Sequence, residues 1–191
     1  MEAIETVAVE MAQSGNEEAF QSLVECHSRR VFQLAFRLTG NEQDAEEVVQ
    51  ETFLRAYRQL ERFESRAQFS TWLHRIAVNC AYDWMRKRRR HVEGRETPAR
   101  HDQSPLLRLA SRQPSADRLL ASQEIRKKVA DTLDRLSLNE RAAFVLRHFE
   151  GLSISEISRQ LDMGTSATKH SIFRAVRKLR EALGPNVGVV S

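Results

Sequence analysis

"FSTWLHRIAVNCAYDWMRKRRR", residues 69–90, decides the fold of the N-terminal half of the chain. Its apolar residues recur three or four positions apart, which places them on one face of an α-helix. They are Phe69, Trp72, Leu73, Ile76, Ala77, Cys80 and Trp84. Five consecutive basic residues, 86–90, end the stretch. The pattern predicts a helix that buries an aromatic face, and its cationic end indicates a second role beyond packing.

Two further helices are predicted before this stretch. They run from about Asn16 to Thr39 and from about Glu42 to Phe63, and "GN" at 40–41 separates them. The buried stripe predicted for the first comprises Phe20, Leu23, Val24, Val31, Leu34, Ala35 and Leu38. The stripe predicted for the second comprises Ala45, Val48, Val49, Phe53, Ala56, Tyr57 and Leu60. No segment alternates with a period of two, so strands are not expected.

A polar, aperiodic segment divides the chain. Three of the four prolines fall within residues 92–116, and this composition is typical of a flexible linker. We therefore expect an N-terminal domain over residues 1–91 and a C-terminal domain over 117–184, followed by a tail at 185–191. The fold class predicted is all-α, with two small helical domains joined by the linker.

The C-terminal domain carries the pattern of a helix-turn-helix. A helical run at 115–136 comes first, and its apolar stripe comprises Leu119, Ile125, Val129, Leu133 and Leu136. Ser153 and Glu156 then form a capping box, which opens a helix of about ten residues. A turn at "MGT", residues 163–165, leads into a longer helix with a basic outer face.

The last helix is expected to present a mixed basic and aromatic surface. Its inward residues are predicted to be Ile172, Val176, Leu179 and Leu183. Lys169, His170, Phe173, Arg174 and Arg177 are then left facing outward. Basic side chains can read guanine edges or neutralise phosphates, and an exposed Phe can contact a thymine methyl. The alternative is an ordinary helical bundle with a solvated basic face.

Charge is segregated along the chain. The net charge is +4 and the isoelectric point about 9.4, which favours an acidic partner, either nucleic acid or a membrane surface. Residues 42–51 carry five acids and no base, whereas residues 164–181 carry five bases and one acid. Separate acidic and basic surfaces indicate two kinds of partner.

Several function classes are disfavoured by the sequence. The two cysteines belong to no CxxC pair, so a disulfide scaffold or a structural zinc site is not expected, and both are interpreted as small core residues. Neither a Gly-rich phosphate loop nor a nucleophile elbow is found, so we expect no enzyme and no cofactor. The start resembles no signal peptide and no apolar run reaches membrane-spanning length, so a cytoplasmic protein is expected.

The outward face of the acidic helix is suited to a protein contact. It comprises Glu46, Glu47, Gln50, Glu51, Leu54 and Arg58. A leucine within an acidic face is typical of protein–protein contacts, although a plain solvated face is the alternative. A metal site is disfavoured because no His stands at ligand spacing.

The outward face of the helix at 69–90 is suited to DNA. It shows Arg75, Asn79, Tyr82 and Arg86. Basic side chains can follow phosphates, while amide and planar side chains can bond or stack on an unpaired base. The short polar loop before this helix could hold an extruded base. The alternative is that both tryptophans belong to the core and that the basic run only begins a solvated linker.

Three motifs in order resemble one known family. "DAEEVVQETFLRAYRQLERF", "FSTWLHRIAVNCAYDWMRKRRR" and "GLSISEISRQLDM…SIFRAVRKL" resemble a sigma factor of bacterial RNA polymerase, of the extracytoplasmic-function (ECF) group in the sigma-70 family. The resemblance covers about residues 10–183. It implies a polymerase subunit that recognises and melts promoters, for a stress or envelope-response regulon. The partners implied are core polymerase, through its β′ clamp helices and β flap, promoter DNA, and an anti-sigma factor.

The resemblance also implies roles for individual residues. Those that match the segment docking on the β′ clamp helices are Asp44, Glu47, Gln50, Glu51, Leu54 and Arg55. Those that match the −10 element surface, including the loop that receives a flipped-out base, are Phe63, Ser65, Arg66, Ser70, Arg75, Asn79, Arg86, Arg88 and Arg89. Those that match the −35 surface are Lys169, His170, Phe173, Arg174 and Arg177.

One segment departs from the family pattern. Where the group often has a Pro-Val-Gly-Thr-Val turn followed by Arg-Ser-Arg, this chain reads "MGTSATKHS" at 163–171, so the −35 preference does not carry over. Two other classes of protein stay open. One is a stand-alone helix-turn-helix regulator, and the other is an interaction protein that binds a partner helix and no DNA.

Overall fold

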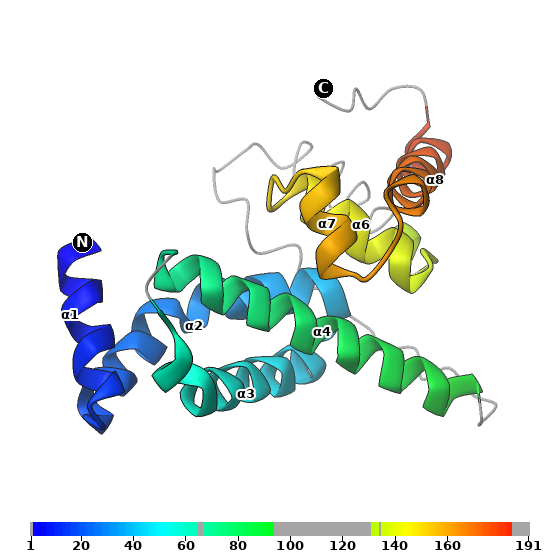
Figure 1. The fold of residues 1–191 in the computed structure, drawn as a ribbon. Coiled ribbons are helices and arrows are strands. Elements are labelled where there is room, and N and C mark those ends of the chain that lie inside the picture. Colours follow the sequence, from blue (N-terminus) through cyan, green and yellow to red (C-terminus); the bar gives the residue numbers. More distant parts are fainter. Residues whose placement is uncertain (1, 65–66, 94–130, 134, 185–191) are drawn as a thin grey trace, which may run out of the picture. The chain divides into compact units, whose positions relative to one another are not determined.

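A computed structural model describes residues 2–64, 67–93, 131–133 and 135–184. Every regular element in these ranges is a helix (Figure 1). The elements are α1 (Glu2–Gln13), α2 (Glu17–Thr39), α3 (Glu42–Gln59), the 3₁₀ helix η1 (Leu60–Arg62), α4 (Phe69–Glu93), α6 (Leu138–His148), α7 (Ile154–Gln160) and α8 (Thr165–Leu183). The predicted all-helical class is confirmed for these residues.

The chain divides into two compact units, residues 1–84 and 85–191, with the boundary inside α4. Several predicted features lie outside the described residues. They are Ser65, Arg66, linker positions 94–116, most of the helical run at 115–136, and the tail at 185–191. α4 continues to Glu93, so the first two positions of the predicted linker are helical.

The break between α2 and α3 follows from its two residues. Gly40 has a φ of 75°, a left-handed conformation that costs little without a Cβ, and its N–H donates to the Phe36 carbonyl at 2.8 Å. Asn41 then caps α3, its side-chain oxygen accepting from the Asp44 N–H at 3.0 Å. Asn16 caps α2 in the same way through the Ala19 N–H. The predicted helix starts are confirmed.

α3 ends earlier than predicted. The α-helix stops at Gln59, the next three residues tighten into η1, and Phe63 is extended, with φ −76° and ψ 107°. The Phe63 N–H closes this corner by donating to the Leu60 carbonyl at 3.0 Å. The chain therefore leaves α3 through a fixed corner at residues 60–63.

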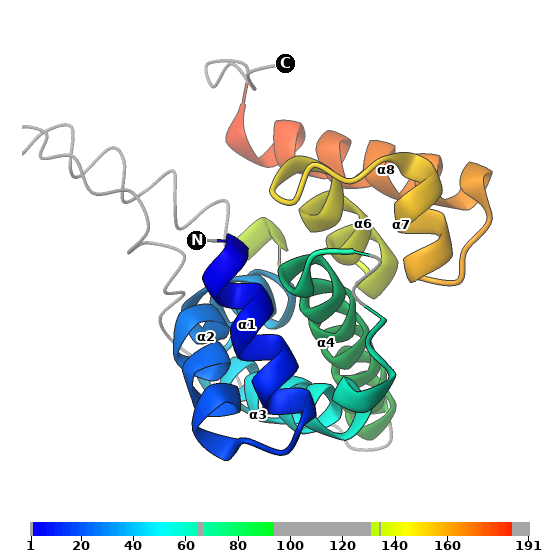
Figure 2. The same cartoon turned by 60° about the vertical axis from the view of Figure 1, so that its left-hand side comes forward.

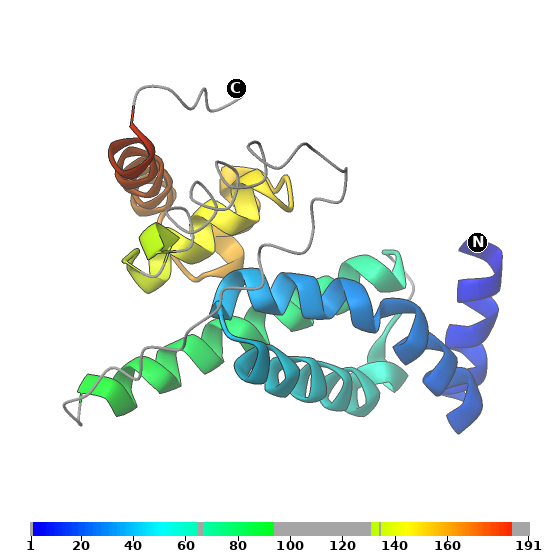
Figure 3. The same cartoon turned by 180° about the vertical axis from the view of Figure 1, so that it is seen from behind.

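The core of the first unit lies among α2, α3 and α4. Views from the front and from behind show α2 and α3 side by side with α4 running along them (Figures 1 and 3). The large side chains of this unit that are almost completely buried are Leu34, Leu38, Val48, Leu60, Leu73 and Val78. This arrangement puts the other faces of α3 and α4 toward solvent.

Several predicted core residues are more exposed in the structure than expected. Tyr57 was expected in the buried stripe but is 48% exposed, because it lies at the edge of the stripe and packs edge-on against Phe20 at 4.9 Å. Trp72 and Trp84 are half-buried rather than fully enclosed. Cys26 is exposed, so of the two cysteines only Cys80 is a core residue.

α1 was not predicted. It packs against α2, buries Val9 and Ala12, and turns into α2 through Gly15 at a φ of 92° (Figure 2). Its sequence offers small or β-branched apolar residues rather than a stripe of large ones. The packing surface is correspondingly thin, and Val7 and Met11 stay exposed.

Capping boxes open two helices of the second unit. The predicted box at Ser153 and Glu156 is present, with both reciprocal hydrogen bonds. A second box, Ser137 with Glu140, opens α6. α7 has seven residues and is shorter than expected, since it ends at Gln160.

Small side chains are buried where α8 packs in the second unit. Thr168 and Ala175 are completely buried on α8, and the Thr168 and Ser158 hydroxyls hydrogen-bond at 3.0 Å between α7 and α8. Ile172 and Val176 were expected in this core but are half-buried, because the close helix contact is made by the smaller residues beside them. The buried cluster adds Leu133, Leu136 and Leu179, with Phe144 packed against it.

Candidate nucleic-acid and protein interfaces

The acidic face of α3 is exposed as predicted. Glu46, Glu47 and Gln50 are exposed, and Leu54 is 45% exposed on the same face. Asp44, Glu51 and Arg55 are half-buried. The face therefore offers an outer row of acids around one apolar side chain, which suits a basic, amphipathic partner segment.

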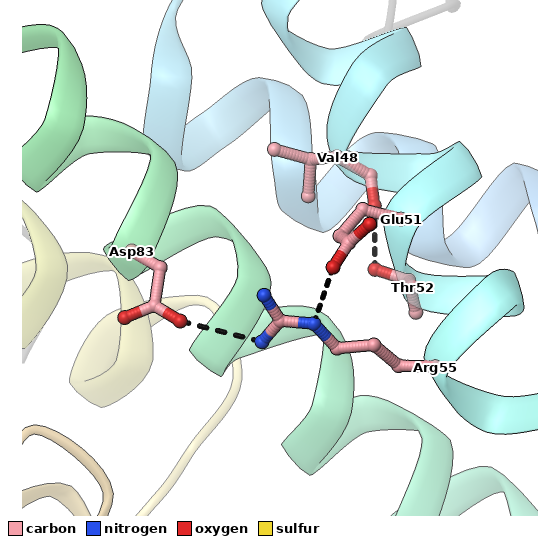
Figure 4. Close-up of polar contacts among 5 residues, drawn as sticks. All are labelled: Val48, Glu51, Thr52, Arg55 and Asp83. Carbon is pink, nitrogen blue, oxygen red and sulfur yellow. Dashed lines mark hydrogen bonds and ion pairs between the residues drawn. The ribbon is translucent and has the colours of Figure 1, made fainter. Parts of the chain in front are cut away.

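Arg55 joins α3 to α4. Its Nε donates to Glu51 Oε1 at 2.6 Å, and a terminal nitrogen donates to Asp83 Oδ2 at 3.3 Å (Figure 4). Burial lowers the pKa of Arg55, but the hydrogen bonds to Glu51 and Asp83 outweigh it, so the pKa lies above the ordinary value. The guanidinium is thus a permanent cation held between two carboxylates.

Asp83 was missed by the sequence analysis. It is the single acid within residues 69–90, and that isolation in a basic helix is the signal that could have found it. Next to Glu51 on α3, the Thr52 hydroxyl donates to the Val48 carbonyl at 2.6 Å, which satisfies a buried polar group (Figure 4). Burial raises the pKa of the nearby Cys80 thiol, which fits a core residue rather than a reactive one.

The outward face of α4 is a row of basic and amide groups. Arg75, Asn79 and Arg86 are exposed and Tyr82 is half-buried, at intervals of three and four residues. Arg88 and Arg89 are also exposed near the cationic end. The opposite face is buried through Leu73, Ala77, Cys80 and Ala81. One helix therefore carries both the core contact and a cationic surface about three turns long.

An aromatic cluster lies where α4 begins. The ring of Phe63 lies 5.9 Å from that of Phe69 and 4.9 Å from that of Trp72, and His27 of α2 lies 5.4 Å from Phe69. Phe63 is only 9% exposed, so its side chain holds the loop rather than facing solvent. Ser70 is half-buried and lines a small hollow with His27 and His74.

The outward face of α8 contains all five residues predicted for it. Lys169, His170, Phe173, Arg174 and Arg177 are exposed, and Phe173 reaches 65%. Three of them, Lys169, Phe173 and Arg177, also line an open groove of about 420 Å³ between α8, the end of α6 and the start of α7. Its lining residues are Arg147, His148, Ile154, Lys169, Ile172, Phe173, Val176, Arg177 and Arg180.

The α6 side of this groove was not predicted from the sequence. Arg147 donates to the Leu152 carbonyl at 3.0 Å, which holds the chain between α6 and α7. Burial, with a smaller effect of the Arg147 charge, lowers the pKa of His148. Arg147 lies on another helix, so the pattern of α8 alone could not have indicated it.

Lys178 lies on α8 but serves the fold. Its Nζ donates to Glu140 Oε2 at 2.6 Å, and the same carboxylate oxygen accepts the Ser137 N–H at 2.9 Å. Burial raises the pKa of Glu140, but these hydrogen bonds outweigh it and hold the pKa below the ordinary value. The basic content of α8 is therefore divided between an internal ion pair and an outward surface.

Neither a metal site nor a membrane span is found in the described parts of the chain. No group of three or more His, Cys, Asp or Glu side chains there is arranged to hold a metal ion. Within the same residues, every helix is too short or too polar to cross a bilayer.

Comparison with known proteins identifies both units. Residues 23–91 match the family Sigma-70 region 2, and residues 126–179 match Sigma-70, region 4. The chain is 34% identical over 182 residues to the ECF RNA polymerase sigma-E factor of Escherichia coli K12, covering 95% of this chain and 93% of that protein.

Two further proteins agree. The ECF RNA polymerase sigma factor SigE of Mycolicibacterium smegmatis is 34% identical over 165 residues, which cover 86% of this chain and 62% of SigE, so the match spans less than two thirds of that relative. The solved structure of CnrH in complex with the cytosolic domain of CnrY is similar with a TM-score of 0.57 and 28% identity, covering 96% of this chain and 99% of CnrH. The chain therefore belongs to the sigma-70 family, in the group of ECF RNA polymerase sigma factors.

Proposed function

We propose that this chain is the promoter-recognition subunit of a bacterial RNA polymerase, which binds core polymerase and directs promoter recognition and melting for a stress or envelope-response regulon. One observation carries the proposal. The Arg55 bridge ties an acidic helix face to a cationic helix face in one unit, while the second unit presents its own basic helix. Promoter opening requires a subunit that contacts the polymerase and the DNA at the same time.

The acidic face of α3 is the proposed docking surface for the β′ clamp helices. Support comes from the exposure of Glu47, Gln50 and Leu54, which places charge and an apolar anchor on one side of the helix. Glu51 and Arg55 contribute mainly by holding that helix against α4. Asp44 stands at the N-terminal turn, where a negative charge favours the helix.

α4 and the loop before it are the proposed −10 surface. The arginines would hold phosphates, and Asn79 would bond the edge of a base removed from the stack. Unstacking a base costs a few kcal/mol, so a surface fixed in advance supplies the compensating contacts. The loop is anchored at both ends by Phe63 and Phe69, and this supports its place in the proposal. The basic run at residues 86–90 would then contact the phosphates of the same DNA strand.

α8 is the proposed −35 surface. A helix-turn-helix places its second helix in the major groove of a duplex, and this helix exposes Lys169, His170, Phe173, Arg174 and Arg177. Arginine and lysine can bond guanine edges, while the phenyl ring can contact a thymine methyl. Since "MGTSATKHS" departs from the common pattern, we expect a −35 preference of its own.

We also propose an inhibitory partner, an anti-sigma factor. CnrH is bound to the cytosolic domain of CnrY in its solved structure, so one protein of this fold binds a partner chain. The exposed Leu54 and Phe173 on the surfaces proposed for polymerase and DNA support such a partner here. The proposed domains are residues 1–91 and 117–184, joined by a linker at 92–116 and followed by the tail at 185–191.

Run-off transcription with core polymerase tests the function. The chain added to core polymerase should give transcripts from promoters that core alone does not use, and sequencing the transcripts would map the two elements. A duplex operator bound without polymerase, with no transcript, would favour a stand-alone regulator. A chain that binds neither DNA nor core would favour an interaction protein.

A further inference from the structure

Gln13 ties α1 to the corner where the chain leaves α3. Its Nε2 donates to the Leu60 carbonyl at 3.0 Å and to the Phe63 carbonyl at 2.8 Å. Both donors of the amide are therefore used on carbonyls 47 and 50 residues away in sequence. The Leu60 carbonyl already accepts the Phe63 N–H, so Gln13 adds a second hydrogen bond there and a further one at the Phe63 carbonyl, and both fix the corner against α1.

The opposite end of α1 reaches the start of α4 through one intermediate residue. Glu5 Oε1 lies 3.1 Å from His27 Nε2, at ion-pair distance but without the alignment of a hydrogen bond. The His27 ring in turn lies 5.4 Å from Phe69, the first residue of α4. The contacts of α1 thus lead to both ends of the short segment between η1 and α4.

The two ends are also packed on each other. Phe63 lies against Phe69 and Trp72 in the cluster described above. The described loop residues Glu64, Ala67 and Gln68 are exposed, whereas Phe63 and Phe69 at its two ends are buried. A loop of this kind depends for its shape on how precisely the end points are placed.

We propose that Gln13 is a positioning residue for capture of an unpaired −10 base, because it fixes the exit corner of the base-capture loop. The inference rests on the proposed function and extends it to an element outside the DNA-facing surface. Losing both donors removes the side-chain hydrogen bonds that join α1 to the corner and leaves only the Phe63 N–H bond to the Leu60 carbonyl within it. A freed corner has to be ordered when DNA binds, and that ordering weakens binding of the unpaired strand.

Three substitutions separate the donors from other properties. Gln13→Glu keeps the size but loses both donors, and Gln13→Met loses them without adding charge. Gln13→Lys keeps an N–H donor group at similar reach, so it should rescue the contact. Gln21→Glu is the matched control, because Gln21 is exposed on α2 and its amide donates only to Glu25 among the contacts known for it.

Holoenzyme reconstituted with each full-length variant is assayed on promoters mapped with the wild type. The probes are a single-stranded non-template oligonucleotide spanning the −10 element and a duplex carrying the −35 element. We expect Gln13→Glu and Gln13→Met to weaken binding of the single strand about tenfold, whereas Gln13→Lys and Gln21→Glu stay near the wild type. Affinity for core polymerase and for the −35 duplex should not change.

These readouts distinguish positioning from a merely structural role. Unchanged single-strand affinity in Gln13→Met overturns the inference, as does an equal loss of core and −10 affinity, which would indicate general unfolding. The melting temperature of each free variant is measured alongside. A wild-type holoenzyme that does not distinguish the −10 strand from a scrambled strand overturns the proposed function itself, a result visible before any variant is made.

Discussion

At the scale of single residues, charge on α3 has two separate uses. Glu47 is exposed and contacts solvent, while Arg55 is committed to Glu51 and Asp83. Family resemblance assigned both residues to docking, and only the side-chain contacts reveal the difference. An acid that faces outward can meet a partner, whereas a cation between two carboxylates of its own chain mainly holds its helix.

This difference predicts opposite effects for two substitutions. Glu47→Lys should weaken binding to core polymerase by at least tenfold without changing the free energy of unfolding, because it reverses an outward charge. Arg55→Ala should lower the free energy of unfolding by about 0.2–1 kcal/mol, since the ion pairs are partly exposed. Titration against core polymerase and urea unfolding measure the two quantities. Glu25→Lys on α2 is the control, and weakened core binding there would contradict the assignment to α3.

Glu140 makes the second unit sensitive to acid. The pKa of Glu140 is lower in the folded state than in the unfolded state, so its ionised carboxylate stabilises the fold. This contribution to the free energy of unfolding is fully present above the unfolded pKa of 4.5 and is lost as the pH falls through the lower folded pKa. Glu140→Gln should cost about 1–2 kcal/mol at pH 7 and remove this part of the acid dependence. Urea unfolding of the full chain from pH 7 down to pH 3 is the measurement. An unchanged pH profile in the variant would contradict the role given to the Lys178 contact.

At the scale of elements, periodicity and caps located the long helices. Asn16, Gly40 and the Ser153 box act through local geometry, which is why sequence alone could place them. α1 was not predicted, because it buries Val9 and Ala12 rather than large apolar side chains. The contacts of Gln13 and Asp83 were not predicted, because each joins helices that are distant in sequence. A local sequence pattern does not indicate which distant carbonyl or guanidinium a side chain will contact.

The turn of the helix-turn-helix also differs from its pattern. The sequence marks Gly164 as the turn residue, but its φ is −66°, and Asp162 instead adopts the left-handed conformation with a φ of 50°. Gly164 is the N-cap of α8 and supplies no side-chain hydrogen bond there. The backbone conformation at position 164 therefore does not require a glycine.

Gly164→Ser should accordingly stabilise the chain. Its backbone is extended, as N-caps require, and a Cβ placed there meets nothing within 4 Å. A serine hydroxyl could accept an N–H of the first turn, for a gain of roughly a few tenths of a kcal/mol in the free energy of unfolding, because glycine is itself tolerated at an N-cap. Gly164→Ala, which adds a methyl group but no acceptor, is the matched control. Equal stability of the two variants would show that capping is not the cause.

At the scale of the whole molecule, two separate units are proposed to read two elements of one DNA. Binding by one unit raises the effective concentration of the other at its element, so each promoter's strength reflects both contacts. This division is a prediction from the sequence, in which the composition separates two segments and each carries its own basic helix. The same division makes the contributions of α4 and α8 experimentally separable.

Arg174→Ala on α8 should weaken holoenzyme binding by about 1–3 kcal/mol on a promoter with an intact −35 element, if its guanidinium reads a base. On a template with a scrambled −35 element that loss should disappear, because the contact is already missing. Asn79→Ala on α4 should show the reverse pattern, with its loss retained on the scrambled −35 template and removed when the −10 element is altered. Equilibrium binding on the three templates measures all four combinations of variant and altered element. If Arg174→Ala weakened binding equally on every template, its arginine would contact phosphate rather than read the −35 sequence, and the direct-readout assignment of α8 at that position would be wrong.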